Sequence, residues 1–399
     1  MNHAPVVRAR GVWTPEGWLE DGAVVLGADL RTILEVREAR AGDGPSLEGL
    51  LVPGLINAHT HLELGHLEGR LPRGGVGFKA WGAALMAARG PLKSDRQRAE
   101  VLARGATSLR ALGVAVVSDI ANLGDVEGAL KDARVRGVVQ HELMGFSPSS
   151  EVLDLARGAG RLSGGVVTRP TAHAPYSTNP EIIRRTAGAR YGAPASIHLA
   201  EDEAERDFLM RGEGTYADWL DELGVAWRHV EAPGCDPVSY LEKLGALGPG
   251  QLVVHGVDLR PAEQRALAAS GSALCLCPRS NLWIGGRLPD VPGLIEAGVL
   301  LCLGTDSLAS CDSLDVLEEI PVLAEAFPDV PPEVWLDLAT QGGAKALGVP
   351  WGRIQPGCAP GLLLLAGVGE VASLCASAPV ERIWCADPGP CPWSSEESP

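Results

Sequence analysis

The chain has 399 residues, of which 46% are hydrophobic and 21% are charged, proportions typical of a folded globular protein rather than a disordered one. Its 50 acidic residues outnumber 34 basic ones and give a net charge of -16, which disfavours nucleic acid and anionic membrane surfaces as partners. The length suits one large α/β domain with an appendage.

Targeting segments and cysteines narrow the class of protein further. No stretch approaches the roughly 20 apolar residues of a membrane-spanning helix, and MNHAPVVRARGVW at the N-terminus lacks the apolar core of a signal peptide. We therefore expect a cytoplasmic protein without a membrane partner. The nine cysteines are scattered or lie in apolar runs such as ALCLCP, which predicts reduced core thiols rather than a disulfide framework.

The two ends of the chain carry strand patterns. Residues 22–39, GAVVLGADLRTILEVREA, alternate apolar and polar side chains like a hairpin, and residues 352–371 look similar. We predict a small β domain formed from residues 1–50 and 349–390. Residues 391–399 are polar and proline-rich, and we expect them to be a disordered tail.

Between these ends, eight short apolar runs alternate with segments of helical character, four of which are residues 95–113, 179–192, 261–271 and 332–348. Eight repeats of strand and helix predict a TIM (β/α)8 barrel over residues 51–348, with its chemistry at the C-terminal ends of the strands. We expect the longer connection, residues 212–250, to fold over the barrel mouth as a lid. The predicted strands are 50–59, 114–120, 136–143, 165–173, 193–200, 251–257, 272–278 and 299–306.

Histidines gather at these strand ends. His59 and His61 are two residues apart, so both side chains point to the same face where the first strand leaves the barrel. The alternative interpretation is that His59 and His61 are an ordinary pair of hydrogen-bonded histidines. His198 and Asp306 also end predicted strands, and three imidazoles with one carboxylate suit zinc while leaving positions open for water and substrate.

Five motifs in this order resemble the metal-dependent amidohydrolase superfamily: PGLINAHTH, HLAE, VVHG, CPRSN and GTDS. The resemblance is closest to the deaminase branch that includes cytosine, S-adenosylhomocysteine and aminodeoxyfutalosine deaminases. It implies that His59, His61, His198 and Asp306 bind one divalent metal ion, with zinc favoured and iron or manganese as alternatives. The fourth strand, RPTAHAPYS, contains no lysine that would bridge two metals, which favours a single ion.

The resemblance also implies a reaction, the hydrolytic deamination of an adenine-bearing nucleoside metabolite such as aminodeoxyfutalosine. In this hypothesis the metal activates water, Asp306 accepts a proton, Glu201 protonates a ring nitrogen and His255 stabilises the developing tetrahedral centre. A charge at a helix N-terminus is the structural alternative for Glu201. Hydrolysis of another cyclic amidine, ring amide, imidazolone or halogenated ring is the functional alternative, and a non-catalytic binding protein on the same barrel is a remote one.

Six further residues follow or flank the barrel strands and are candidates for contact with a small-molecule substrate. Each has a structural alternative, such as helix packing for Trp81, solvent exposure for Arg73 and a structural hydrogen bond for Glu142. A homodimer would be ordinary for an enzyme of this size. The candidate substrate-binding residues are His173, Tyr176, Glu63, Glu142, Arg73 and Trp81.

Overall fold

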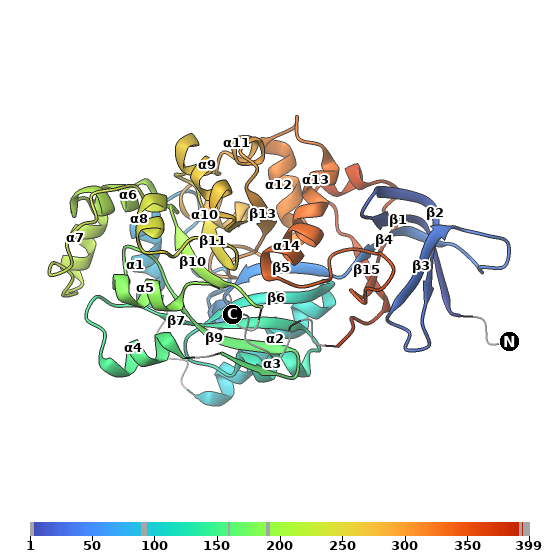
Figure 1. Ribbon diagram of the computed structural model, residues 1–399, viewed down its shortest axis with the longest axis horizontal. Coiled ribbons are helices and arrows are strands. Elements are labelled where there is room, and N and C mark those ends of the chain that lie inside the picture. Colours follow the sequence, from blue (N-terminus) through green and yellow to red (C-terminus); the bar gives the residue numbers. More distant parts are fainter. Residues whose placement is uncertain (1–3, 89–93, 159, 189–191, 391–392, 394–399) are drawn as a thin grey trace.

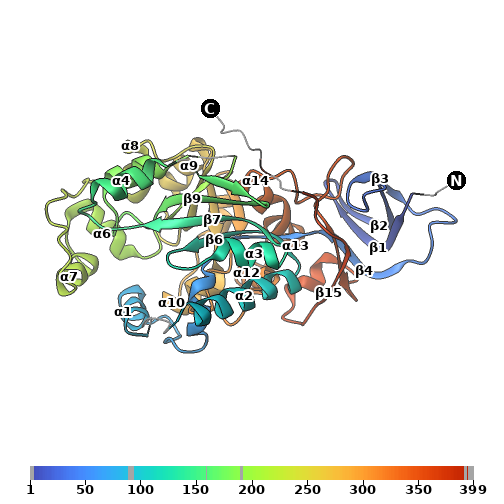
Figure 2. The same ribbon diagram turned by 90° about the horizontal axis from the view of Figure 1, so that it is seen from below.

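The computed structural model describes residues 4–88, 94–158, 160–188, 192–390 and 393, and places their strands in three sheets. A six-stranded sheet has the order β15-β14-β4-β1-β2-β3, a five-stranded sheet the order β5-β6-β7-β9-β8, and a four-stranded sheet the order β10-β11-β12-β13. The six-stranded sheet lies at one end of an elongated molecule, and the other two sheets with their helices form the rest (Figures 1 and 2).

All eight predicted parallel strands are present. Their apolar side chains are almost entirely buried, as expected for strands covered on both faces. The short strand β8 (Arg161–Ser163) adds an antiparallel edge next to β9. The parallel strands are β5 (Leu55–Thr60), β6 (Val114–Ala121), β7 (Arg136–Leu143), β9 (Val166–Ala172), β10 (Ala195–Leu199), β11 (Gln251–His255), β12 (Ala273–Leu276) and β13 (Leu300–Leu303).

Hydrogen bonds join these two parallel sheets at both of their edges. Between β9 and β10, the amide of His198 donates to the carbonyl of His173 at 2.9 Å. At the other edge, Thr60 forms a parallel bridge with Asp306, and the His61 amide donates to the Asp306 carbonyl at 2.9 Å. The first and last parallel strands therefore meet where the predicted metal ligands lie.

Helices connect the strands and cover their outer faces. Helix α2 (Asp95–Ala111) begins where the Ser94 hydroxyl accepts a hydrogen bond from the Gln97 amide. Helix α9 (Pro261–Ser270) is followed by Gly271, whose φ of 76° ends the helix. The predicted helices 95–113 and 261–271 are confirmed, whereas 332–348 is interrupted by a π turn, η3 (Leu338–Gly342). In the predicted helix 179–192 only α5 forms among the described residues, and residues 189–191 lie outside them.

The α-helices are α1 (Phe78–Ala88), α2 (Asp95–Ala111), α3 (Val126–Asp132), α4 (Ser150–Arg157), α5 (Pro180–Thr186), α6 (Glu203–Arg211), α7 (Thr215–Glu222), α8 (Pro237–Lys243), α9 (Pro261–Ser270), α10 (Pro278–Ile284), α11 (Val291–Glu296), α12 (Glu319–Ala326), α13 (Pro332–Asp337) and α14 (Gly343–Leu347). Three short 3-10 helices are η1 (Leu62–Leu67), η2 (Val316–Glu318) and η4 (Val371–Cys375). Helix α7, from the predicted lid segment, lies at the end of the molecule opposite the six-stranded sheet (Figure 1).

Two strand predictions were wrong in detail, one for the first barrel strand and one for the C-terminal segment. The run 50–59 is not one strand but two, β4 (Leu47–Pro53) and β5, which belong to different sheets and separate at Gly54. Residues 352–371 contain only β14 (Leu362–Ala366), whose antiparallel partner β15 (Glu381–Ala386) comes after η4 rather than after a tight turn.

The remaining strands of the six-stranded sheet come from the start of the chain. They are β1 (Val6–Thr14), β2 (Gly17–Leu26) and β3 (Ile33–Glu38), and the antiparallel pairing of β2 with β3 confirms the hairpin predicted at 22–39. Strand β14 pairs with β4, so both terminal segments contribute to one sheet.

Three further expectations have mixed outcomes. Trp393, in the predicted disordered tail, is buried and donates its indole N–H to the Leu347 carbonyl at 3.1 Å, while residues 391–392 and 394–399 lie outside the described part.

The eight cysteines in the described ranges are free thiols, but only four are in the core; Cys235, Cys358, Cys375 and Cys385 are partly exposed. Within the same ranges, no helix combines the length and apolarity needed to cross a bilayer.

Candidate active site

Four predicted metal ligands converge where β5, β10 and β13 end. The Nε2 atoms of His59 and His61 lie 3.2 Å apart, and the Nε2 atom of His198 lies 3.3 Å from that of His59. The Oδ1 atom of Asp306 is 3.4 Å from His61 Nε2 and 3.8 Å from His59 Nε2. The structure therefore brings together all four residues that the sequence assigned to the metal.

The protonation of these imidazoles fits a shared cation. The Nδ1 atom of His198 donates to the His173 carbonyl at 2.9 Å, which leaves its Nε2 lone pair facing His59. Burial lowers the pKa of His59 and of His198, so both rings are neutral at pH 7. Neutral imidazole nitrogens and a carboxylate oxygen this close together are a donor set that a divalent cation can share.

Asp306 is held by two hydroxyl groups. Its Oδ2 atom accepts hydrogen bonds from Ser280 at 2.6 Å and from Ser310 at 2.7 Å, so Oδ1 is the oxygen that faces the imidazoles. Its backbone adopts a left-handed φ of 58°, as does that of His255 at 77°. Non-glycine residues in this region are strained by about 1–3 kcal/mol each, and such strain concentrates at functional sites.

Glu201 and His255 face each other beside the predicted metal ligands. Glu201 Oε1 lies 3.7 Å from His255 Nε2, and both side chains are almost fully buried. Burial, reinforced by the nearby carboxylates of Asp306 and Glu205, raises the pKa of Glu201 well above its usual value. A carboxyl group with a raised pKa keeps its proton to higher pH, which favours a role as a general acid.

The second nitrogen of His255 is also engaged. The Asn281 amide group lies 3.0 Å from His255 Nδ1 and donates to it, which places the ring proton on Nε2, the atom that faces Glu201. Burial lowers the pKa of His255 well below its usual value, so this ring is a neutral hydrogen-bond donor.

A cavity of about 370 Å³ opens onto these groups. It is lined by His61, His198, Glu201, His255 and Asp306, while His59 lies behind them with no exposed surface. Five of the six predicted substrate contacts also line it: His173, Tyr176, Glu63, Glu142 and Trp81.

Two of the predicted substrate contacts have other roles. Arg73 does not line this cavity; its guanidinium group stacks on the Trp283 ring at 3.9 Å and pairs with Asp312. The prediction that Arg73 contacts substrate therefore has no support in the structure. Glu63 lines the cavity, but its carboxylate accepts hydrogen bonds from the backbone amides of Asn122, Leu123 and Gly124.

Sequence reasoning missed the aromatic wall of this cavity. Phe78 from α1 packs edge-on against Tyr176 with ring centroids 5.7 Å apart, and the ring of Tyr216 from α7 lies tilted against Tyr176 with centroids 4.5 Å apart. Both residues line the cavity, together with Trp219 of α7. The predicted lid segment therefore contributes to the cavity, and the aromatic side chains in TYADW were the sequence signal that pointed there.

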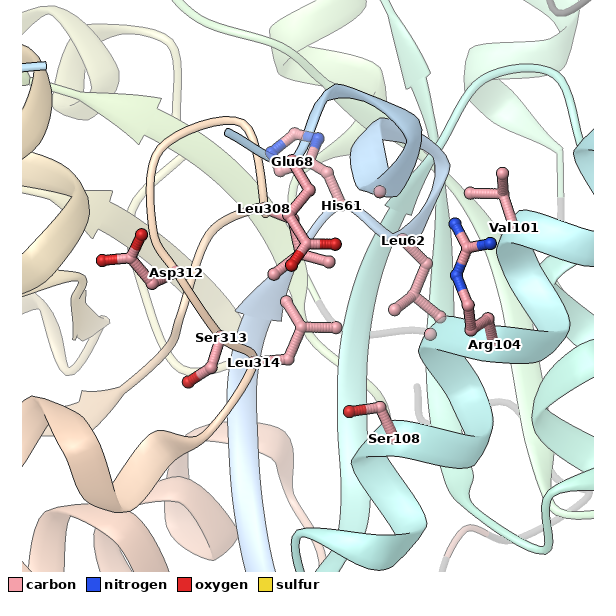
Figure 3. A pocket seen from close by; sticks show the side chains of 12 residues that line it. His61, Leu62, Glu68, Val101, Arg104, Ser108, Leu308, Asp312, Ser313 and Leu314 are labelled. Atoms are coloured by element: carbon pink, nitrogen blue, oxygen red, sulfur yellow. The ribbon is translucent and has the colours of Figure 1, made fainter. Parts of the chain in front are cut away.

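A second, smaller cavity of about 190 Å³ lies on another side of His61. Figure 3 shows Arg104 and Ser108 projecting from α2 on one side of it, and Asp312 and Ser313 on the loop after β13 opposite. Of the predicted catalytic and metal-binding residues, this cavity contacts His61 alone. The larger cavity is therefore the candidate active site.

Comparison with known proteins decides the family. A model of the amidohydrolase family matches residues 50–386, most of the chain and every strand that carries a candidate ligand. This chain belongs to the amidohydrolase family. The predicted family is thereby confirmed.

Curated relatives of this amidohydrolase are deaminases. A 5-methylthioadenosine/S-adenosylhomocysteine deaminase of Halobacterium salinarum is 27% identical over 375 residues, which cover 88% of this chain and 81% of the relative. An aminodeoxyfutalosine deaminase of Deinococcus radiodurans is 29% identical over 363 residues, which cover 85% and 82% of the two chains. These names agree with the deaminase branch predicted from the motifs.

Solved structures share the fold. Helicobacter pylori aminofutalosine deaminase in complex with methylthio-coformycin has a TM-score of 0.79 and 21% identity, with 96% of this chain and 99% of that chain covered. An adenosine deaminase from Xanthomonas campestris with bound zinc has a TM-score of 0.75 and 22% identity, with 98% and 94% covered. Atrazine chlorohydrolase TrzN from Arthrobacter aurescens, complexed with zinc, has a TM-score of 0.75 and 19% identity, with 94% and 92% covered.

Proposed function

We propose that this amidohydrolase removes the amino group of an adenine-bearing nucleoside as ammonia by hydrolysis. The observation that carries the proposal is the position of Glu201, a buried carboxyl group with a raised pKa that lines the same cavity as the cluster of histidines and Asp306. Deamination of an amidine ring requires a proton donor beside the attacked carbon, and Glu201 meets that requirement. The names of the curated relatives support the same reaction.

We further propose that His59, His61, His198 and Asp306 hold one divalent metal ion, and that it is zinc. Imidazole nitrogens with a carboxylate suit zinc, iron and manganese, and zinc is the metal named with two structural neighbours. When bound, such an ion supplies Lewis acidity that makes water nucleophilic near neutral pH. The support for this assignment is the clustering of the ligand atoms, because His59 Nε2 lies 3.2 Å from His61 Nε2, 3.3 Å from His198 Nε2 and 3.8 Å from Asp306 Oδ1.

The protein groups around the cavity account for the proton transfers. Asp306, with Oδ2 occupied by two hydroxyls, accepts the proton of the attacking water through Oδ1. Glu201 donates its proton to the ring nitrogen next to the attacked carbon, and the Nε2–H of His255 donates a hydrogen bond to the developing oxyanion. The proton taken up by Asp306 passes to the amino group, which leaves as ammonia, and the second proton of the water returns to Glu201 as the ring carbon becomes a carbonyl.

The cavity walls supply the proposed substrate contacts. His173 and Glu142 lie together, with Nε2 of the histidine 4.0 Å from Oε1 of the glutamate, and both face the space next to His198. The buried Tyr176 hydroxyl has no hydrogen-bond partner among the described residues. Trp81 donates to the Ala309 carbonyl at 3.3 Å, so its indole ring is fixed as an apolar wall.

The architecture is part of the proposal. We propose that the four- and five-stranded sheets close into one (β/α)8 barrel over residues 51–348, supported by the hydrogen bonds at both edges. The six-stranded sheet would be the small β domain of residues 1–50 and 349–390, with a boundary that falls inside β4. A cytoplasmic location and a homodimer remain predictions from the sequence.

Hydrolysis of a halogenated ring is a second candidate, because a chlorohydrolase has the same fold with a TM-score of 0.75. The two candidates release different products from their rings. Purified, zinc-loaded protein would be assayed for ammonia from adenosine, 5-methylthioadenosine, S-adenosylhomocysteine and aminodeoxyfutalosine, and for chloride from atrazine.

The control for this assay is the Glu201→Gln protein, which keeps the shape of the side chain but cannot donate the same proton. We expect ammonia from at least one nucleoside and a loss of about 100-fold or more in kcat for the variant, with zinc content unchanged. Chloride release without ammonia would favour the second candidate. Unchanged turnover in Glu201→Gln would contradict the role of this residue.

A further inference from the structure

The outer part of the cavity differs chemically from the part next to the metal ligands. Away from Glu201 and His255, its walls are aromatic and aliphatic side chains from α1 and from the segment that begins at α7. Phe78, Trp81 and Trp219 form one cluster, with the Phe78 ring 6.1 Å from each of the two indole rings. The outer part of the cavity, which would receive the end of a substrate opposite its reacting ring, is therefore largely apolar.

The rim of the same cavity is apolar as well. Met86, Met144 and Leu223 all line the cavity and are 45%, 48% and 46% exposed. Large apolar side chains this exposed are informative when they gather around one opening, because they mark a surface that a ligand covers. Methionine side chains adapt to apolar groups of different shapes, which suits a variable substituent.

The described side chains that line the cavity include acids but no strong base. Among the described residues that line it, there is no lysine or arginine, whereas Glu63, Glu142, Glu201 and Asp306 contribute carboxyl groups. Arg73, the arginine that the sequence suggested for substrate contact, is paired with Asp312 outside the cavity. The net charge of the chain, -16, also repels an approaching anion.

We propose that the cavity selects adenine nucleosides whose 5′ substituent is uncharged and apolar, and discriminates against those with a carboxylate at that end. The inference rests on the proposed deaminase function and specifies its substrate class. A carboxylate moved from water into this space would lose hydration without gaining a cationic partner, while an apolar group would gain burial. The proposal therefore favours a thioether such as 5-methylthioadenosine over S-adenosylhomocysteine or aminodeoxyfutalosine, both of which carry a carboxylate.

A matched pair of substrates tests this selectivity. The probes are 5′-phenylthioadenosine and its para-carboxyphenyl analogue, which differ by one carboxylate at the far end of the same ring. With zinc-loaded protein we expect kcat/KM for the neutral member to exceed that for the anionic member at least tenfold. Equal values, or a preference for the carboxylated member, would overturn the proposal.

Two charge variants with the same substitution locate the origin of the selectivity. Leu223→Arg adds a cation at the rim, and Leu155→Arg adds one on α4, where Leu155 is 61% exposed and does not line the cavity. We expect Leu223→Arg to lower the ratio of the two kcat/KM values at least threefold, while Leu155→Arg leaves it unchanged. The same ratio in all three proteins would overturn the assignment to this rim.

Measurements of binding test the proposed selectivity independently of the proposed reaction. Dissociation constants of the same two nucleosides are measured by calorimetry with zinc-loaded protein. If neither nucleoside releases ammonia but the neutral one binds at least tenfold more tightly, the deaminase function fails and the selectivity stands. If ammonia is released with no preference in either measurement, the selectivity fails and the deaminase function stands.

Discussion

The four residues of the candidate metal site could be named from the sequence, whereas Ser310, which holds one of them, could not. His59, His61, His198 and Asp306 each end a recognisable apolar run, and the ends of parallel strands meet at one edge of a sheet. Ser310 lies on a loop whose path no periodicity describes, yet its hydroxyl holds Asp306 at 2.7 Å. The contact of Ser310 with Asp306 therefore required the structure.

Glu63 illustrates a residue whose type suggested substrate binding but whose contacts are structural. Its two oxygens accept backbone N–H groups from three consecutive residues, including Asn122 at 2.9 Å and Leu123 at 2.7 Å. In Glu63→Gln, one oxygen is replaced by an NH2 group that faces N–H donors. We expect the free energy of unfolding to fall by about 1–3 kcal/mol, measured by urea denaturation.

The control for Glu63 is Glu68→Gln, which makes the same chemical change at an exposed position of the neighbouring loop. We expect this variant to unfold like the unmodified protein. The KM of Glu63→Gln for the best nucleoside should stay close to that of the unmodified enzyme. A large rise in KM at unchanged stability would show that Glu63 binds substrate instead.

At the scale of elements, hydrophobic patterns located every parallel strand but did not assign strands to sheets. The run LLVPGLINAH has no polar side chain before Asn57, because both β4 and β5 are buried, and nothing in its periodicity marks the change of sheet. The change occurs at Gly54, next to the Pro360 carbonyl and the Trp384 ring near β14 and β15. Contacts between segments about 300 residues apart therefore fix the boundary.

Gly54→Ala tests that explanation. A Cβ atom at this position would lie 2.5 Å from the Ala115 Cβ and 2.8 Å from the Pro360 carbonyl oxygen, distances at which the backbone must shift. We expect the free energy of unfolding to fall by about 1–3 kcal/mol, as for other overpacked sites. Gly369→Ala is the control, because its nearest contact would be an ordinary 3.7 Å to Arg10. Equal stability of the two variants in urea would contradict the close approach at Gly54.

At the scale of the whole molecule, the proposed metal site lies where the beginning and end of the parallel strands meet. His59 and His61 belong to the first parallel strand and its exit, His198 to the fifth, and Asp306 follows the eighth. The Thr60–Asp306 bridge joins the same two segments through the backbone. An ion held by these four side chains would therefore cross-link parts of the chain that are distant in sequence.

This arrangement predicts that metal binding stabilises the entire fold and not one loop. An ion that binds only the native state adds about 2.7 kcal/mol when its concentration is 100 times its Kd. We expect chelation to lower the Tm measured by scanning calorimetry and one equivalent of zinc to restore it. His61→Ala should abolish the restoration, whereas His141→Ala, at an exposed position on β7, should preserve it. A rise in Tm with zinc that is the same in both variants would place the stabilising ion outside this cluster.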